Sequence, residues 1–120
     1  MAATLSDRVA VLLPLAPRDY LILFALIDGP LHGHGILKVV ESAAGGVVLD
    51  PANLYRSLRK LERDELVVET KAGGKAEAST RRSFQLTTLG RAVLAAEAHR
   101  LTELADAARR RKLVPAHTIK

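Results

Sequence analysis

Two histidines stand on either side of a glycine in the stretch "PLHGHGILKVVE", residues 30–41. His32 and His34 could bind a metal ion, or one could act as a general base, because neutral imidazole does both. Residues at i and i+2 of a helix point to different sides, so one helix cannot bring both rings to one metal. The chain has no cysteine, and no nearby acidic residue completes a ligand set. We therefore expect a structural turn here, with no metal, no cofactor and no catalytic role.

The composition describes one small domain with an aliphatic core. The chain has 120 residues, of which 48% are hydrophobic and only 3% aromatic, and this length suits a single core. The absence of cysteine excludes disulfides and a cysteine nucleophile. The longest stretches without a charge are nine residues, against the roughly 20 that span a bilayer. Asp7 precedes the N-terminal apolar run, which argues against a signal peptide, and we expect a cytoplasmic protein.

The positive charge lies in the second part of the chain. Residues 1–50 carry three Lys/Arg and five Asp/Glu, a net of −2, whereas residues 51–120 carry fifteen and eight, a net of +7, which together give the formal +5. Such an asymmetry favours a polyanionic partner, most often nucleic acid. A merely solvated basic surface explains the charge equally well. The motifs must therefore decide between a nucleic-acid partner and an ordinary surface.

Proline and glycine divide the first half of the chain into short helices. Thr4 and Asp7 have the spacing of a capping box ahead of an apolar face. Pro17 suits the first turn of a second helix that is apolar over residues 20–27, so we expect that helix to be nearly buried. A third helix is predicted from about Gly33 to Ala44.

The stretch "LDPANLYRSLRKLERDEL" predicts the clearest helix. Asp50 is a good N-cap and Pro51 is pre-set for the first helical position. Leu54, Leu58 and Leu61 form one buried stripe. The opposite face is mostly basic and holds Ala52, Asn53, Arg56, Arg59, Lys60 and Arg63. This profile is typical of helices that read DNA, although ordinary surface helices share it.

Two β-like runs, "LVVET" and "RSFQLT", follow and predict a basic hairpin with its tip at Gly73-Gly74. Thr87 or Thr88 then caps a last helix reaching about Arg111, with an apolar seam at 4-3-4-3 spacing that needs a partner helix. The expected fold class is mainly α with a small β-hairpin: a winged helix-turn-helix with an N-terminal helix and a C-terminal dimerisation helix. We expect an N-terminal helix in residues 1–16, the winged domain in 17–87, the dimerisation helix in 88–112 and a flexible tail in 113–120.

Three ordered blocks between Tyr20 and Leu94 resemble the PadR family of transcriptional regulators. "ILFALIDGPLHGHGILKVVE" is similar to the family's "GPxHGY" turn, "DPANLYRSLRKLERDELVVE" to its recognition helix "PGTLYxxLxRLExxGLI", and "RRSFQLTTLGRAVL" to its wing and last-helix entry "RRYYRLTxxGRxxL". The resemblance implies a homodimeric repressor, relieved by a small-molecule effector, that binds a pseudo-palindromic operator in double-stranded DNA. The chain departs from the pattern at His34 (Tyr in the family), Ala52-Asn53 (Gly-Thr), Glu65 (Gly) and Phe84-Gln85 (two aromatics).

In a winged helix the N-terminal end of the recognition helix enters the major groove, so Ala52, Asn53, Arg56 and Ser57 are best placed for base edges. Arg59 and Lys60 are expected to contact phosphates, as are the basic residues of the hairpin. Tyr55 either positions a phosphate or packs at the edge of the core. The candidate DNA-binding residues are Ala52, Asn53, Tyr55, Arg56, Ser57, Arg59, Lys60, Lys71, Lys75, Arg81 and Arg82.

The dimer is expected to form through the last helix with support from the first. The assigned residues are Leu5, Val9, Leu12, Leu13, Leu94, Ala98, Leu101, Leu104, Ala105 and Ala108. The family often senses aromatic compounds near this interface, but the last helix has no aromatic residue. Because Tyr20 and Phe24 are expected in the core, planar compounds should bind weakly.

The sequence also allows a second interpretation of the basic run near its end and two other classes of protein. The "RRRK" run at 109–112 is either a nucleic-acid patch or a set of cations that favour a helix C-terminus. A winged-helix module that contacts only proteins would show no dependence on Arg56. A small enzyme would need a convergent polar site, and the sequence presents no nucleophile–base or metal constellation.

Overall fold

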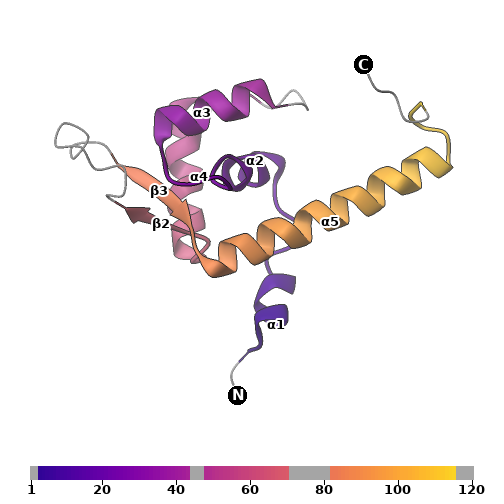
Figure 1. Ribbon diagram of the computed structural model, residues 1–120, viewed down its shortest axis with the longest axis horizontal. Helices are drawn as coiled ribbons and strands as arrows, with labels where there is room; N and C mark the ends of the chain where they lie inside the picture. The colour runs from indigo at the N-terminus through magenta and orange to yellow at the C-terminus, as the bar shows by residue number, and fades with distance from the viewer. Residues whose placement is uncertain (1–2, 44–47, 71–81, 116–120) are drawn as a thin grey trace.

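A computed structural model of the chain describes residues 3–43, 48–70 and 82–115. The fold is mainly helical with one small antiparallel sheet (Figure 1), which confirms the expected fold class. None of the helices in these ranges is both long and apolar enough to cross a membrane. The elements are α1 (Leu5–Ala10), α2 (Pro17–Ala25), β1 (Leu31–His32), α3 (Gly33–Ser42), α4 (Pro51–Arg63), β2 (Val67–Thr70), β3 (Ser83–Leu86) and α5 (Thr88–Arg110).

The helices begin where local side chains satisfy their first amide groups. Thr4 and Asp7 form the predicted capping box at α1, with the Asp7 amide donating to Thr4 Oγ1 over 3.0 Å. Pro17 occupies the first turn of α2, and Asp50 and Thr87 cap α4 and α5 through their side chains. The chain therefore starts its helices at the residues that the sequence indicated.

The sheet has three strands in the order β1-β3-β2, all antiparallel. β2 and β3 form the expected hairpin, with Val67 opposite Leu86 and Thr70 opposite Ser83. β1 was not predicted: Leu31 and His32 pair with Phe84 and Ser83 on the other side of β3. Two residues are too short to show the alternation that marks a strand, so only the fold itself reveals this one.

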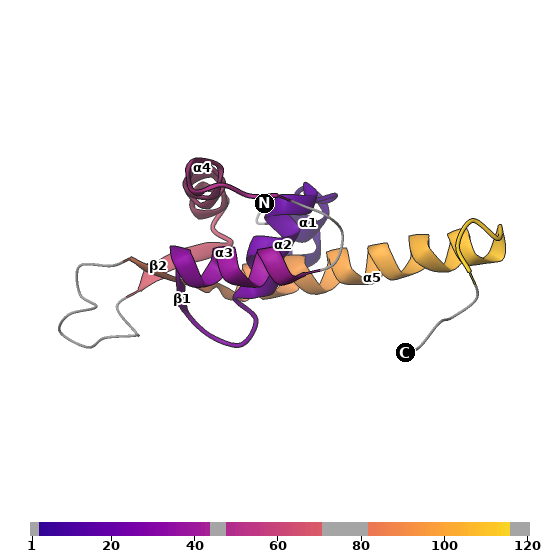
Figure 2. The same ribbon diagram turned by 90° about the horizontal axis from the view of Figure 1, so that it is seen from above.

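One aliphatic core joins the helices to the sheet. Ile22, Leu23, Ile36, Leu58 and Phe84 are each no more than 1% exposed. α2 packs on α3 and α5, and α3 packs on α4. Figure 2 shows these helices gathered at one end of the molecule, with the sheet beside them. The core therefore holds α4 firmly while its outer side faces solvent.

The second half of α5 projects away from this body. Figures 1 and 2 both show α5 extending well beyond the packed helices. The radius of gyration, 16.0 Å, exceeds the roughly 14 Å expected for a compact chain of this length. Leu101 and Leu104 lie on this half and are 37% and 54% exposed. These two leucines are therefore not covered within the protomer.

Two expectations about burial are wrong. Phe24 is 43% exposed and stacks on Tyr20, whose ring centre lies 6.2 Å away. α2 packs on both α3 and α5 but leaves one narrow side uncovered, where Phe24 lies; Ile27, in the turn after α2, is 38% exposed. The reason given for weak binding of planar compounds therefore fails at Phe24. Leu94, assigned to the dimer, is 6% exposed and belongs to the protomer's own core.

Candidate nucleic-acid interface

Helix α4 is fixed by its inner stripe and its cap. Leu54, Leu58 and Leu61 are at most 1% exposed. Asp50 Oδ1 accepts from the Asn53 amide over 2.8 Å. These contacts hold the N-terminal turn of the helix in place, which is the part that a winged helix inserts into the major groove.

The polar groups at this end of α4 form a chain of hydrogen bonds. Asn53 Nδ2 donates to Asp50 Oδ2 over 3.2 Å, and Arg56 Nη1 donates to Asn53 Oδ1 over 2.7 Å. Arg56 and the neighbouring Ala52 are exposed. An amide and a guanidinium side by side match the groups that read adenine and guanine in the major groove. The geometry therefore presents both side chains together, each oriented by its neighbour.

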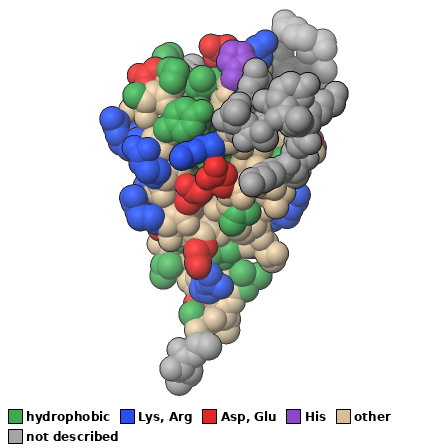
Figure 3. All heavy atoms as spheres, turned by 90° about the vertical axis from the view of Figure 1, so that its left-hand side faces the viewer, with side chains coloured by type: hydrophobic (Ala, Val, Ile, Leu, Met, Phe, Trp, Pro, Cys, Tyr) green, Lys and Arg blue, Asp and Glu red, His purple; other side chains and the backbone are tan. Residues whose placement is uncertain are grey.

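Further along α4, two cations differ in their surroundings. Lys60 Nζ lies 3.3 Å from Asp19 Oδ2, a carboxylate in the first turn of α2 that is 4% exposed. Arg59 is exposed and makes no ion pair or side-chain hydrogen bond with any residue in the described ranges. Figure 3 views the end of the molecule that carries the sheet, and Lys and Arg side chains gather along one edge of it.

Ser57 requires a correction. Its side chain was expected to reach base edges, but Ser57 is 6% exposed and lies between the inner stripe and the start of α2. Ser57 lies three residues after Leu54 and four before Leu61, beside the inner stripe, where burial depends on the neighbouring helix. A residue so enclosed cannot extend to a base.

Tyr55 packs against the turn that carries the two histidines. Tyr55 is 38% exposed, and a Cβ at Gly33 would clash with its hydroxyl and lie 3.0 Å from Cζ. Gly33 therefore allows α3 and α4 to approach closely, a reason for glycine that the sequence alone did not reveal. Tyr55 remains at the surface beside Arg56 and Arg59 on α4.

His32 links β1 to β3, the second strand of the wing hairpin. Its Nδ1 is hydrogen-bonded to Ser83 Oγ, 2.7 Å away, while His34 is exposed. Ser83 is only 3% exposed, whereas His32 is partly exposed. Within the described ranges no group of three or more His, Cys, Asp or Glu side chains could hold a metal ion. The pair is placed to hold the sheet together.

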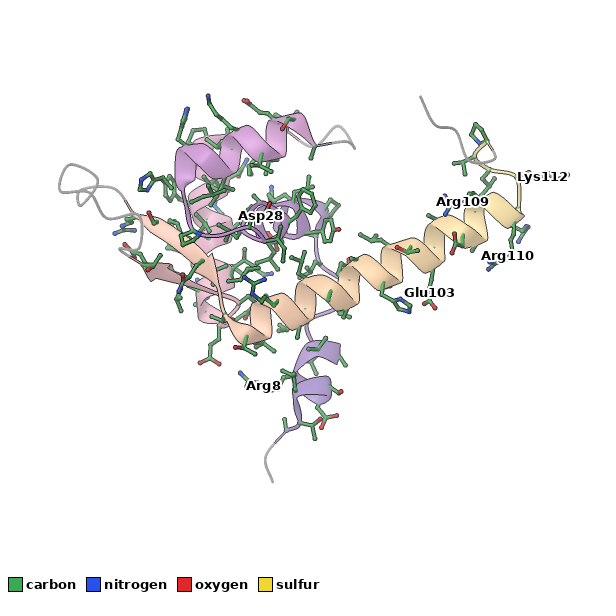
Figure 4. All side chains as sticks on the ribbon, viewed as in Figure 1. Arg8, Asp28, Glu103, Arg109, Arg110 and Lys112 are labelled. Carbon is green, nitrogen blue, oxygen red and sulfur yellow. The ribbon has the colours of Figure 1, made fainter. Side chains whose placement is uncertain are left out.

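The wing is described only at its base. Arg82 lies 3.4 Å from Glu69 across the hairpin, and both side chains are well exposed. Lys71, Lys75 and Arg81 lie outside the described residues. At the other end of the molecule, Arg109, Arg110 and Lys112 gather at the C-terminal end of α5 (Figure 4), where Arg109 pairs with Asp106. Cations at this end of a helix are favoured electrostatically.

The turn between α4 and β2 depends on an unusual backbone. Glu65 has φ 65°, a left-handed conformation that glycine adopts more easily. This is the position where the sequence departs from the family's glycine. Its side chain pairs with Arg8 of α1 over 3.0 Å. Thr87 Oγ1 donates to the Glu65 carbonyl over 2.6 Å, which fastens the turn to the start of α5.

A buried carboxylate on α5 was missed by sequence reasoning. Glu97 is 1% exposed and accepts two hydrogen bonds of 2.6 Å from Arg100 and one of 3.2 Å from the Leu15 amide. The Arg100 hydrogen bonds lower the pKa of the Glu97 carboxyl, and the Leu15 amide adds to this, while burial opposes it. Glu97 thereby fixes the segment before α2 to α5.

We expect Glu97→Gln to lower the free energy of unfolding at pH 7 by about 2 kcal/mol, because a charged hydrogen-bond network is lost. A carboxyl whose pKa is lowered by folding stabilises the fold above its usual pKa of 4.5 and loses that effect as the pH falls through the lowered value. The difference between variant and wild type should therefore shrink on acidification below pH 4.5. Urea denaturation at several pH values measures this.

Glu103→Gln is the matched control, because Glu103 pairs with His99 on the exposed side of the same helix. Its change in stability should be close to zero. Equal losses for the two variants would contradict a special role for the buried carboxylate.

Comparison with known proteins supports this view of the fold. The "Transcriptional regulator PadR-like family" matches residues 22–96. A protein of a Streptomyces fradiae transposon, described as an uncharacterized 37.1 kDa protein, is 40% identical over 84 residues, which are 70% of this chain. The chain spans about a quarter of that relative's length, since the match covers 23% of it.

Solved structures share the architecture at low identity. A PadR family transcription regulator from Clostridium difficile superposes with a TM-score of 0.67 at 20% identity, covering 79% of this chain and 97% of that one. A transcriptional regulator from Clostridium thermocellum gives 0.63 at 20% identity, covering 91% and 97%. The regulator BldR from Sulfolobus solfataricus gives 0.66 at 19% identity, covering 86% and 67%. With the match over residues 22–96 and the winged fold, the chain belongs to the PadR-like family of transcriptional regulators.

Proposed function

We propose that this PadR-like regulator is a homodimer that binds a pseudo-palindromic DNA operator and represses transcription until a small-molecule effector releases it. The observation that carries the proposal is the N-terminal end of α4, where Asn53 and Arg56 are hydrogen-bonded to each other on a firmly anchored helix. An amide and a guanidinium at this place suit adenine and guanine edges.

The surrounding charges support a DNA backbone on either side of that contact. Arg59 is exposed and without an ion-pair partner in the described ranges, and Arg82 stands at the base of the wing. Phosphate contacts position a protein on the duplex, whereas base contacts select the sequence. The wing residues Lys71, Lys75 and Arg81 are part of the proposal from the sequence.

The dimer is supported by the exposed half of α5. Leu101 and Leu104 on α5 are 37% and 54% exposed, Leu113 just after the helix is 76% exposed, and Leu5 on α1 is 50% exposed. α1 contacts α5 within the protomer, and we propose that it supports the same interface. Two copies related by a two-fold axis would bring two copies of α4 to successive half-sites.

Binding to the protein's own promoter should be strongly salt-dependent. Two basic helices and wings that neutralise roughly 6–10 phosphates give a slope of log affinity against log salt of about −5 to −9. Arg56→Ala should reduce discrimination between operator and random DNA by about tenfold, since one base contact contributes about 1–3 kcal/mol. Fluorescence anisotropy with both duplexes measures the two quantities.

Arg59→Ala is the control on the same helix. Loss of a phosphate contact should weaken operator and random DNA equally and reduce the salt slope by about 1. The DNA-binding proposal would be contradicted if the affinity did not change with salt, or if the protein preferred no duplex among promoter fragments. Activity that survives Arg56→Ala in a transcription assay would instead favour a module that contacts proteins.

A further inference from the structure

A groove of about 390 Å³ opens between the start of α2 and the outer side of α4. We call it the basic groove, because four of its lining residues are cations and only Asp19 is acidic. The lining residues are Ala16, Arg18, Asp19, Asn53, Arg56, Ser57, Lys60 and Arg63. Asn53 and Arg56 belong both to this groove and to the end of α4 proposed to read bases, so the two surfaces are continuous.

The charges of the basic groove are incompletely balanced. Asp19 is 4% exposed and faces Lys60 at 3.3 Å. Arg18 and Arg63 are exposed and have no ion-pair partner among the described residues. One buried carboxylate therefore holds one lysine in place and leaves an excess of positive charge around the groove. An anion is the ligand that such a surface attracts.

Ser57 supplies an independent observation. It is 6% exposed, it lines the basic groove, and its Oγ makes no hydrogen bond within the part of the chain that the structure describes. No buried side-chain oxygen or nitrogen in the described ranges lacks a partner, so the Ser57 hydroxyl is open to the groove and not sealed in the protein. It is therefore available to donate to a group that enters the groove.

The start of α2 also lines the groove. No side chain caps the helix at Ala16, Pro17 has no N–H to donate, and Asp19 is the acidic residue of the first turn. Ala16, Arg18 and Asp19 all line the groove. An uncapped helix N-terminus carries partial positive charge and favours phosphate oxygens.

We propose that the basic groove binds one phosphate group of the DNA backbone, with Ser57 donating from its floor and Arg18, Lys60 and Arg63 surrounding it. This inference rests on the proposed DNA-binding function. It assigns new roles to Arg18 and Arg63. It also gives a reason for the burial of Ser57 beside the N-terminal end of α4, which is proposed to contact bases. The phosphate would flank the bases that Asn53 and Arg56 contact and would fix the register of α4 on the duplex.

Replacing single phosphates in the operator with neutral methylphosphonates tests the proposal. With the wild-type protein, one position in each half-site should lower the affinity about tenfold, as expected for a lost charged hydrogen bond. Ser57→Ala and Arg63→Gln should each weaken binding to the unmodified duplex. For these two variants the methylphosphonate at that position should then lower the affinity much less than it does for the wild type. Arg91→Gln removes one exposed charge from α5, outside the groove, and should retain the full decrease.

Ser57→Ala should melt at the wild-type temperature, because the hydroxyl has no described protein partner to lose. A clear loss of stability would show that the hydroxyl is structural and would overturn its role as a ligand donor. The groove proposal is also overturned if Ser57→Ala and Arg63→Gln show the wild-type decrease at every methylphosphonate position.

A failure of the groove can be told apart from a failure of DNA binding. If the wild-type protein prefers no duplex, the proposed function fails, and inorganic phosphate is titrated against chloride at equal ionic strength. If the Ser57 and Arg18 amide resonances shift and saturate with phosphate, the groove is an anion site, but its phosphate does not come from DNA. Unchanged resonances would overturn the site altogether.

Discussion

Gly90→Ala should destabilise the protein by about 3 kcal/mol or more, as for a buried position that is overpacked. A Cβ at Gly90 would clash with the backbone carbonyl oxygen of Leu66, which cannot rotate away. That oxygen also accepts from the Thr87 amide over 3.1 Å. Separation of α5 from the α4–β2 turn would break this junction, so the melting temperature should fall by at least about 10 °C.

Gly35→Ala is the matched control. There the three atoms nearest to a Cβ would all be side-chain atoms of Leu31, the closest at 3.3 Å. Alanine also favours the interior of α3 over glycine by roughly 1 kcal/mol, so the melting temperature should change little. If both variants melted like the wild type, the prediction would be wrong, because the backbone at Gly90 could then move without a loss of folding free energy.

Leu101→Glu should convert the dimer into monomers. The side of α5 that buries Leu89, Val93 and Glu97 in the protomer continues into the projecting half, where Leu101 and Leu104 are exposed. An unpaired charge in the interface formed there costs several kcal/mol. The dissociation constant of the dimer should rise at least about 100-fold, since each 1.4 kcal/mol is a factor of ten.

Analytical ultracentrifugation across a concentration series measures that constant. Thr102→Glu places the same charge one residue along, about 100° around the helix, and should leave the dimer intact. DNA binding to a duplex with two half-sites should weaken for Leu101→Glu alone. A wild-type protein that sediments as a monomer, or a Leu101→Glu dimer as stable as the wild type, would contradict the interface.

The sequence predicted most of the local structure because its signals were local. The capping box of Thr4 and Asp7, the N-cap at Asp50 and the leucine stripe of α4 each depend on residues within one or two turns. The periodicity and order of the elements then indicated the winged fold. These features need no knowledge of which helix packs on which.

The errors came from contacts between distant segments. Glu97 is buried because the Leu15 amide, 82 residues away, meets it, and no local pattern reports such a contact. Ser57 is enclosed by the start of α2, and Phe24 lies on the side of α2 that α3 and α5 leave uncovered. Burial at the border of an amphipathic face is decided by the neighbouring element, which a helical wheel does not contain.

The placing of the tyrosines has a practical consequence for spectroscopy. The chain has no tryptophan and two tyrosines, so its intrinsic emission comes from Tyr20 and Tyr55 alone. Tyr20 stacks on the exposed Phe24, whereas Tyr55 sits on α4 against Gly33, beside the proposed base-reading end. A Tyr20→Phe protein would emit only from the α4 surface. The molecule therefore carries a single-residue fluorophore at the very surface where operator binding is proposed, and no dye has to be attached to observe it.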